Sequence, residues 1–221
     1  MLPMIRDNVL KMLAYLPAEV KLVVAAKGAN CEEVRQSAEA GAEIVGVNYL
    51  QEAEEWVTAL GNIAQWHFIG HLQKNKVRKA VKIFDMIQTV DSFELAVIID
   101  KECAKINKVM PVLIEVNSAC EPQKAGAMPQ DVEALAESMA ALSNLRLRGL
   151  MTMGPISENP EHSRMFFSDT KLLFDKIKNN QGKSWAKWDT LSMGMSNSWR
   201  IAVEEGTTMV RIGTAIFGQR D

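Results

Sequence analysis

The sequence lacks both a long hydrophobic run and an excess of charge of one sign. No apolar stretch in its 221 residues reaches the roughly 18 residues that a membrane-spanning helix needs. Lysine plus arginine (25) nearly balance aspartate plus glutamate (27), which leaves a net charge of −2. No tail or long block carries one sign, and this argues against a dedicated binder of nucleic acid or of an acidic membrane surface.

Cysteine is scarce as well. Cys31, Cys103 and Cys120 are scattered along the chain and form no CxxC pair. Such an odd, dispersed set is typical of reduced thiols rather than of a disulfide framework. Residues 1–7 also lack the basic segment and apolar core of a secretory signal. We therefore expect a cytoplasmic protein.

A metal site is not indicated by the three histidines. His67 and His71 flank the apolar stretch Phe68-Ile69-Gly70, which we predict to be a strand. Four residues along a strand span ~13 Å, too far for two side chains to share one ion. No cysteine or carboxylate cluster joins them, so we predict no metal site.

A basic cluster follows the histidines. It lacks interleaved aromatic residues, so we predict a solvated helix face rather than a surface for nucleic acid. Its members are Lys74, Lys76, Arg78, Lys79 and Lys82.

Short apolar strands alternate with helical patterns along the chain. Right-handed crossovers close eight such βα units into a barrel. An open Rossmann-type sheet is the alternative, but its GxGxxG turn is absent. We predict a protein of the α/β class, one (β/α)8 TIM-barrel domain over residues 1–221, with an extra N-terminal helix over 4–14. The strands are expected at 21–27, 43–48, 66–70, 85–90, 111–117, 145–152, 189–194 and 209–213.

A single lysine ends the first predicted strand. The run from Leu22 to Ala26 is apolar throughout, as in a parallel strand that is covered on both faces. Lys27 follows, at the carboxyl end of the strand, where α/β barrels bind their ligands. A lysine is costly to desolvate there, so it indicates a functional group. A solvated strand-end lysine is the alternative.

Polar residues also follow other predicted strands. Asn48 ends the second strand, Glu115 lies near the end of the fifth, and Arg211 interrupts the apolar eighth strand. Arginine is rarely buried without a partner. We expect Arg211 to bind a carboxylate such as Glu115, a ring nitrogen or a phosphate.

Two loops have the composition of an anion site. Gly194-Met195-Ser196-Asn197 follows the seventh strand, and Gly213-Thr214-Ala215 follows the eighth. Small residues let backbone N–H groups approach a phosphate, and barrels commonly hold phosphate at these two loops. Ordinary helix capping by serine and threonine is the alternative.

Six segments, in order and covering nearly the whole chain, match the pattern of one family: Val23–Lys27, Val47–Glu52, Trp66–Lys76, Leu145–Met151, Leu191–Ser196 and Met209–Gly218. Through them the chain resembles the pyridoxal 5′-phosphate (PLP) homeostasis proteins of the YggS/PROSC family. The resemblance implies a fold-type III PLP-binding barrel like the N-terminal domain of alanine racemase.

The resemblance also implies roles for individual residues. Lys27 matches the lysine that forms a Schiff base with PLP, and Arg211 matches the arginine near the pyridine nitrogen. Asn48 matches a residue that lines the cofactor pocket. The phosphate site is implied at Ser196, Gly213 and Thr214, with Met195 from the same loop as Ser196.

The chain departs from the family pattern at four places. None of them removes the lysine or the phosphate loops, but they alter the expected hydrogen bonding around the cofactor. The departures are Ala26 and Gly28 in place of the usual Ser and Thr beside the lysine, Val47 in place of Glu, His71 in place of Pro, and Asn197 in place of Asp.

We expect a PLP carrier or buffer in vitamin B6 homeostasis, without a catalytic residue. An always-protonated arginine near the pyridine nitrogen weakens PLP as an electron sink. The sequence ends at Asp221, without the C-terminal domain whose tyrosine is the second base of alanine racemase; its only tyrosines are Tyr15 and Tyr49. We expect a monomer that passes PLP to PLP-dependent apo-enzymes. The alternatives are a weak PLP-dependent amino-acid racemase and a barrel enzyme for another phosphorylated ligand.

Overall fold

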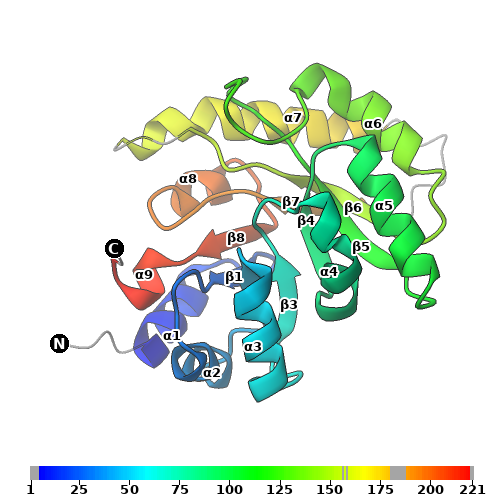
Figure 1. Ribbon diagram of the computed structural model, residues 1–221. Coiled ribbons are helices and arrows are strands. Elements are labelled where there is room, and N and C mark those ends of the chain that lie inside the picture. The colour runs from blue at the N-terminus through cyan, green and yellow to red at the C-terminus, as the bar shows by residue number, and fades with distance from the viewer. Residues whose placement is uncertain (1–4, 156, 158, 180–187, 220–221) are drawn as a thin grey trace.

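The computed structural model describes residues 5–155, 157, 159–179 and 188–219, and within them eight parallel strands close into a barrel (Figure 1). The neighbours follow chain order from β1 to β8, and β8 pairs back onto β1. The predicted (β/α)8 barrel is confirmed. The strands are β1 (Lys21–Ala25), β2 (Ile44–Val47), β3 (Gln65–Phe68), β4 (Met86–Val90), β5 (Met110–Glu115), β6 (Leu145–Met151), β7 (Thr190–Ser192) and β8 (Met209–Ile212).

Helices surround the barrel, and the extra helix α1 packs beside the last helix α9 (Figure 1). Asn8 of α1 donates from Nδ2 to the carbonyl of Ile216 in α9 at 2.9 Å. None of the described helices is long and apolar enough to cross a membrane. The helices are α1 (Ile5–Tyr15), α2 (Cys31–Glu39), α3 (Leu50–Leu60), α4 (Val77–Ile83), α5 (Phe93–Ala104), α6 (Val132–Met139), α7 (Arg164–Asn179), α8 (Trp199–Glu204) and α9 (Thr214–Phe217).

Most strands end before their predicted carboxyl ends. β1 stops at Ala25, although the amide of Ala26 still donates to the carbonyl of Gly46. A turn closed by the amide of Ala29 on the carbonyl of Ala26 (2.8 Å) then carries Lys27. The predicted basic helix that carries Lys74 and Lys82 begins as a 3₁₀ turn, Lys74–Lys76, before α4. Met4, predicted to start the first helix, lies outside the described residues.

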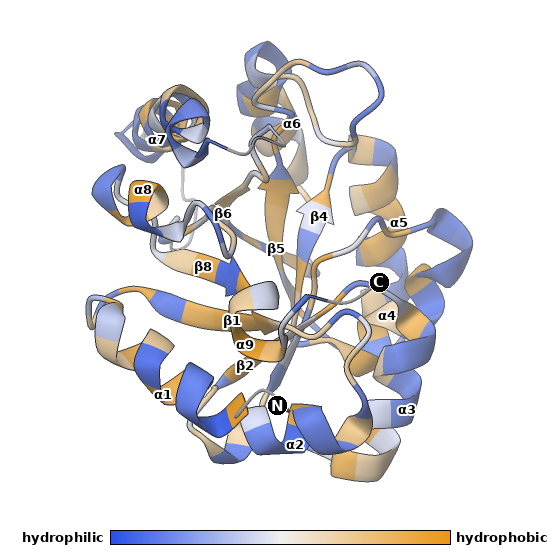
Figure 2. Ribbon diagram, turned by 90° about the vertical axis from the view of Figure 1, so that its left-hand side faces the viewer, coloured by the Kyte–Doolittle hydropathy of each residue, from blue (hydrophilic) through white to orange (hydrophobic). Residues whose placement is uncertain are grey.

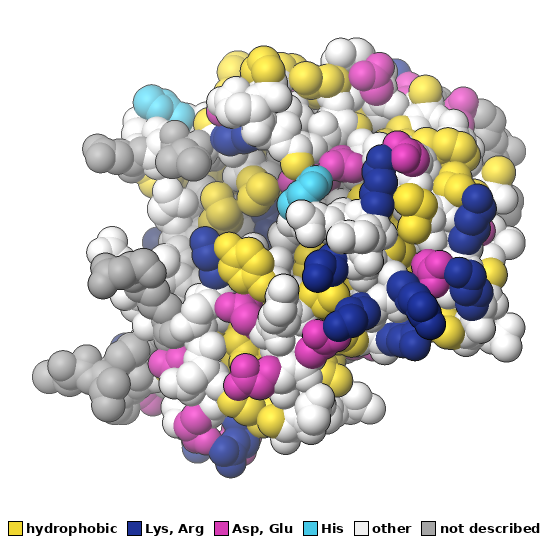
Figure 3. All heavy atoms as spheres, viewed as in Figure 1, with side chains coloured by type: hydrophobic (Ala, Val, Ile, Leu, Met, Phe, Trp, Pro, Cys, Tyr) yellow, Lys and Arg dark blue, Asp and Glu magenta, His cyan; other side chains and the backbone are white. Residues whose placement is uncertain are grey.

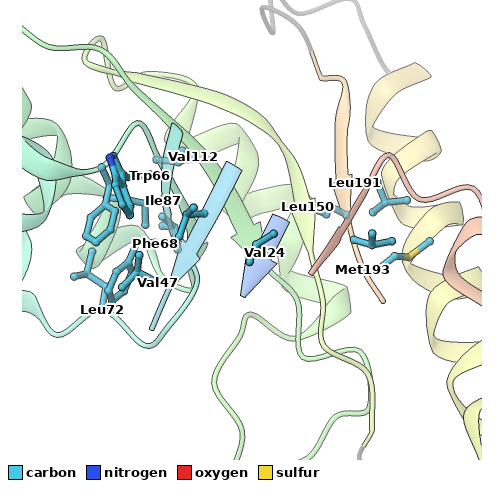
Figure 4. Close-up of a cluster of buried hydrophobic side chains, with 14 of the residues drawn as sticks. Val24, Val47, Trp66, Phe68, Leu72, Ile87, Val112, Leu150, Leu191 and Met193 are labelled. Carbon is cyan, nitrogen blue, oxygen red and sulfur yellow. The ribbon is translucent and has the colours of Figure 1, made fainter. Parts of the chain in front are cut away.

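Alternate residues of each strand point outward and form the main core. Figure 2 shows that the strands are predominantly hydrophobic, whereas the helices carry hydrophilic residues along one side. Figure 4 shows part of the layer between the strands and the helices. Its labelled members are all buried, and they are Val24, Val47, Trp66, Phe68, Leu72, Ile87, Val112, Leu150, Leu191 and Met193.

The strand residues at the intervening positions form two small apolar clusters, separate from the main core. Val23, Ile44 and Met209 make one, and Met86, Leu113 and Met151 make the other. Buried polar side chains occupy further positions on strands β3, β4, β5, β7 and β8: His67, Gln88, Glu115, Ser192 and Arg211. The barrel interior is therefore partly polar.

The predicted basic helix face carries ion pairs to its neighbours. Lys74 contacts Glu94 at 2.5 Å, and Lys79 contacts Glu54 at 2.7 Å. Figure 3 shows lysine and arginine side chains interspersed with carboxylates on this side of the molecule. Alternating charges of both signs are typical of a solvated surface.

A bulge in β6 depends on Gly149. The register with β5 slips between Leu147 and Gly149, so that Arg148 is left out of the ladder and binds Asp189 through two hydrogen bonds of 2.8 and 2.6 Å. Gly149 has φ +147°, and a Cβ there would lie 1.9 Å from the carbonyl oxygen of Thr190. Glycine therefore permits the contact between β6 and β7.

We predict that Gly149→Ala lowers the free energy of unfolding by about 2–3 kcal/mol, the cost of overpacking against fixed backbone. Urea denaturation measures this. Gly61→Ala is the matched control, because Gly61 also has a positive φ (+62°) but its Cβ would meet nothing within 4 Å. Equal losses for the two variants would contradict the steric explanation.

Candidate functional site

Lys27 lies on the barrel rim where β1 and β8 are neighbours. The register pairs Val23 with Arg211 and Val24 with Ile212, so Lys27 comes just beyond the carboxyl end of this pair. Its side chain is exposed. The rim also carries the loops after β7 and β8.

Glu52 supports the turn after Lys27. One carboxylate oxygen accepts a hydrogen bond from the amide of Gly28 at 3.3 Å. Its other oxygen, Oε2, is buried and lacks a hydrogen-bond partner among the described residues. Burial raises the pKa of Glu52, while the Gly28 hydrogen bond and the charge of Lys27 lower it. Glu52 therefore places an incompletely bonded carboxylate beside Lys27, a role that the sequence alone did not reveal.

The structure brings the two predicted anion loops together. The hydroxyl oxygen of Ser196 accepts hydrogen bonds from the amides of Gly213 and Ala215, both at 3.2 Å. Gly213 also packs against β1, since a Cβ there would lie 3.0 Å from the carbonyl oxygen of Ala25. Two backbone donors and one hydroxyl therefore meet beside the end of β1. These are groups that bind phosphate.

The other predicted residues lie around the same rim. Thr214 is exposed and begins α9, and Met195 is half-buried, with its amide donating to the hydroxyl of Ser198 at 3.2 Å. Asn48 is half-buried just after β2. A Cβ on Gly70 would lie 2.2 Å from the carbonyl oxygen of Asn48, so the ends of β2 and β3 approach closely there.

Arg211 is buried inside the barrel, with only 5% of its surface exposed. Its Nη1 donates to the hydroxyl of Ser192 at 2.7 Å, and its Nη2 donates to the carbonyl of Thr152 at 2.8 Å. Burial lowers the pKa of Arg211 to about 10, and the carboxylate of Glu115 opposes this shift. Arg211 therefore stays charged at neutral pH. Its hydrogen bonds go to a hydroxyl and a carbonyl, whereas Glu115, the carboxylate suggested by the sequence, acts through its charge.

A chain of buried side chains continues from Arg211 across the barrel. Ser192 donates to Oε1 of Gln88 at 2.8 Å, and Nε2 of Gln88 lies 3.0 Å from Nδ1 of His67. Ser192 must accept from Arg211 because a guanidinium only donates. Because Oε1 of Gln88 accepts from Ser192, its Nε2 donates to His67, and Nδ1 of His67 is then an unprotonated acceptor. Burial, and secondarily the charge of Lys21, lower the pKa of His67 to about 3.

Gln88 and Ser192 were missed by sequence reasoning. Gln88 is a long polar side chain inside a buried strand, just as Arg211 is, and this shared feature is the signal that could have paired them. Ser192 gives no such signal, because a serine near a strand end is common. His67 lies inside the barrel and His71 is exposed on the rim. No group of His, Cys, Asp and Glu within the described ranges could hold a metal ion.

Glu115 is a second buried ionisable group, at the carboxyl end of β5, with 3% of its surface exposed. It borders a small cavity together with Lys124 and Thr152. Burial, and then the negative charge of Asp91, raise the pKa of Glu115 to about 7, although Arg211 lowers it. Glu115 therefore exchanges a proton near neutral pH.

A polar cleft of about 800 Å³ opens on the rim beside the ends of β3, β4 and β5. Its cations are already paired: Lys74 with Glu94, and Lys124 with Glu121 at 2.6 Å. The cleft and the small cavity at Glu115 share Lys124 and Ala125. An open cleft therefore lies next to the buried charges of the barrel.

Known proteins share both the sequence and the architecture. The family model described as "Alanine racemase, N-terminal domain" matches residues 2–221. The pyridoxal phosphate homeostasis protein of Aquifex aeolicus is 39% identical over 201 residues, which cover 90% of this chain and 87% of the relative. That of Pseudomonas aeruginosa is 37% identical and covers 98% of this chain and 96% of the relative.

The chain belongs to the pyridoxal phosphate homeostasis protein family. Among solved structures, PipY of Synechococcus elongatus PCC7942, without PLP, superimposes with a TM-score of 0.91 at 31% identity, covering 97% of this chain and 100% of PipY. PipY with PLP bound gives a TM-score of 0.88. An alanine racemase of Clostridium difficile has a TM-score of 0.84 but only 16% identity, covering 98% of this chain and 57% of the racemase, and shares the fold alone.

Glu115→Gln should stabilise the protein at alkaline pH. The pKa of Glu115 is raised from 4.5 to about 7 in the folded protein, so its charging costs stability as pH rises from 4.5 through 7. The variant should gain about 2 kcal/mol in free energy of unfolding at pH 8 and almost nothing at pH 4.5. Urea denaturation at both pH values measures the gain. A gain that is equal at both would contradict the assigned burial.

His67→Asn should remove part of the acid sensitivity, since the asparagine oxygen can still accept from Gln88. The folded pKa of about 3 lies below the usual 6.5, so wild-type stability is lost as pH falls from 6.5 toward 3. The slope difference between wild type and variant should approach one proton, about 1.4 kcal/mol per pH unit. Identical slopes between pH 6.5 and 4.5 would show that His67 is protonated in the fold.

Proposed function

We propose that this protein binds PLP as a Schiff base on Lys27 and keeps it available in vitamin B6 homeostasis. The observation that carries the proposal is the set of groups around one part of the rim. Lys27 follows β1, the buried Arg211 lies on the neighbouring strand, and Ser196 meets the amides of Gly213 and Ala215. The naming of the relatives and PipY with PLP bound support the same ligand.

The chemical types in this set fit the three polar parts of PLP. A lysine amine suits the aldehyde, a permanently charged arginine suits the unprotonated ring nitrogen, and two N–H groups with a hydroxyl suit the phosphate. Asn48, Met195 and Thr214 would complete the lining. When bound, PLP supplies an aldehyde that reacts reversibly with amines.

A carrier role follows from the arginine that would lie beside the ring nitrogen of PLP. Arg211 is held in place by Ser192 and Thr152 and carries its charge at neutral pH. A cation beside the ring nitrogen disfavours its protonation, which weakens the ring as an electron sink. The site therefore favours storage of the aldehyde and its transfer to PLP-dependent apo-enzymes over carbanion chemistry.

Weak amino-acid racemisation is the second candidate, and one observation favours it. Glu115 is buried close to the charge of Arg211 and exchanges a proton near neutral pH, as a general acid or base requires. In deuterium oxide, a racemase would place deuterium at the α-carbon of added amino acids, and Glu115→Gln would abolish it. Deuterium incorporation above background in the wild type would sink the carrier proposal.

The absorption spectrum of the purified protein with PLP tests the site. The wild type should show the visible band of a Schiff base, and borohydride followed by peptide mass mapping should locate PLP on Lys27. Lys27→Ala should lose the band. Lys21→Ala is the control that should retain it, because Lys21 lies at the opposite end of the same strand. A mapped adduct on another lysine would refute the assignment.

A further inference from the structure

We propose that Ser192 and Gln88 are positioning residues that orient Arg211 toward the ring nitrogen of PLP, with His67 as the fixed end of the chain. The inference rests on the proposed function, because it requires that PLP binds with its ring nitrogen near Arg211. It concerns the four side chains that run from β3 through β4 and β7 to β8.

The four hydrogen-bonded side chains are buried, and the contacts between them are short. The exposed fractions are 2% for His67 and 0% for both Gln88 and Ser192. Its three contacts measure 3.0, 2.8 and 2.7 Å from His67 to Arg211. In such surroundings a polar group that loses its partner is costly, so each member restricts the rotamer of the next.

Polarity makes the chain directional. Arg211 can only donate, so Ser192 accepts from it, and the hydroxyl proton of Ser192 goes to Oε1 of Gln88. The amide of Gln88 must then present its oxygen to Ser192 and its NH₂ to His67. An inverted amide would place its NH₂ against the hydroxyl proton and its oxygen against Nδ1 of His67. The neutral His67 therefore fixes the orientation of the Gln88 amide, and through it the lone pair with which Ser192 accepts from Arg211.

Arg211 is held at both terminal nitrogens. Ser192 binds Nη1 from β7, and the carbonyl of Thr152 binds Nη2 from beyond β6. These two anchors define the plane of the guanidinium, and neither uses its Nε. The Thr152 anchor is backbone and therefore constant, whereas the Ser192 anchor depends on a side chain that Gln88 holds. Loss of Ser192 or Gln88 should therefore let the guanidinium turn away from the ring.

A displaced Arg211 would change the chemistry of bound PLP in a measurable way. The ring nitrogen could then take up a proton, which withdraws electrons and lowers the pH at which the Schiff base loses its own proton. We expect Ser192→Ala and Gln88→Met each to lower the pH midpoint of the visible band by about one unit. PLP binding should weaken about tenfold, the effect of one lost hydrogen bond to a charged group.

Thr190→Val is the matched control. Thr190 lies on the same strand as Ser192, is buried at 6% exposure, and donates its hydroxyl to Asp189 at 2.9 Å rather than to the chain. The control should keep the wild-type midpoint and affinity even where its thermal stability falls. Thermal unfolding of each PLP-free variant records that purely structural effect separately.

The pH titration of the visible band separates the positioning role of Ser192 and Gln88 from the proposed PLP-binding function. A wild type that takes up no PLP overturns the proposed function and this inference with it. A wild type that forms the Lys27 adduct, alongside a Ser192→Ala or Gln88→Met variant with an unchanged midpoint, overturns only the positioning role. If one variant does not fold, the other decides. A control that shifts as far as the two variants also overturns the role, because the effect would then be general.

Discussion

A buried guanidinium is the constraint on which the interior of this barrel depends. Removing the charge of Arg211 from water is costly, and a barrel of eight apolar strands offers little to offset that cost. The structure satisfies it with the hydroxyl of Ser192, the carbonyl of Thr152 and the nearby charge of Glu115. Gln88 then accepts from Ser192, and a neutral His67 accepts from Gln88. The hydrogen-bonded polar side chains from His67 to Ser192 are thus all linked to Arg211.

The groups on the solvent-exposed rim lie beside the same strand, β8. β1 and β8 are neighbours, so Lys27 comes beside the end of the strand that carries Arg211. The glycine at 213 lets the loop after β8 pack on β1 and point its amides at Ser196. An amine, a cation and a loop with backbone N–H donors therefore lie together. Glu52 and Glu115 add carboxyl groups whose raised pKa values both arise chiefly from burial.

The sequence predicted the fold well, because the buried parallel strands are short and largely apolar and alternate with segments whose apolar residues recur at helical spacing. Polar residues at the ends of apolar strands are conspicuous, so the sequence also singled out Lys27, Arg211 and the two loops. The structure brings them to one part of the rim, and their functional roles stay predictions. The role of Glu52 depends on the turn at Gly28, which no local pattern encodes. The chain from His67 to Ser192 joins three strands far apart in sequence, so its contacts arise only when the barrel closes.

The central claim, that these groups form one PLP site, is tested most directly by a crystal structure of the protein with PLP. We predict electron density that is continuous from Nζ of Lys27, a ring nitrogen within hydrogen-bond distance of Arg211, and a phosphate on the amides of Gly213 and Ala215 in contact with Ser196. PLP attached to a different lysine, or a phosphate held elsewhere on the rim, would contradict the claim.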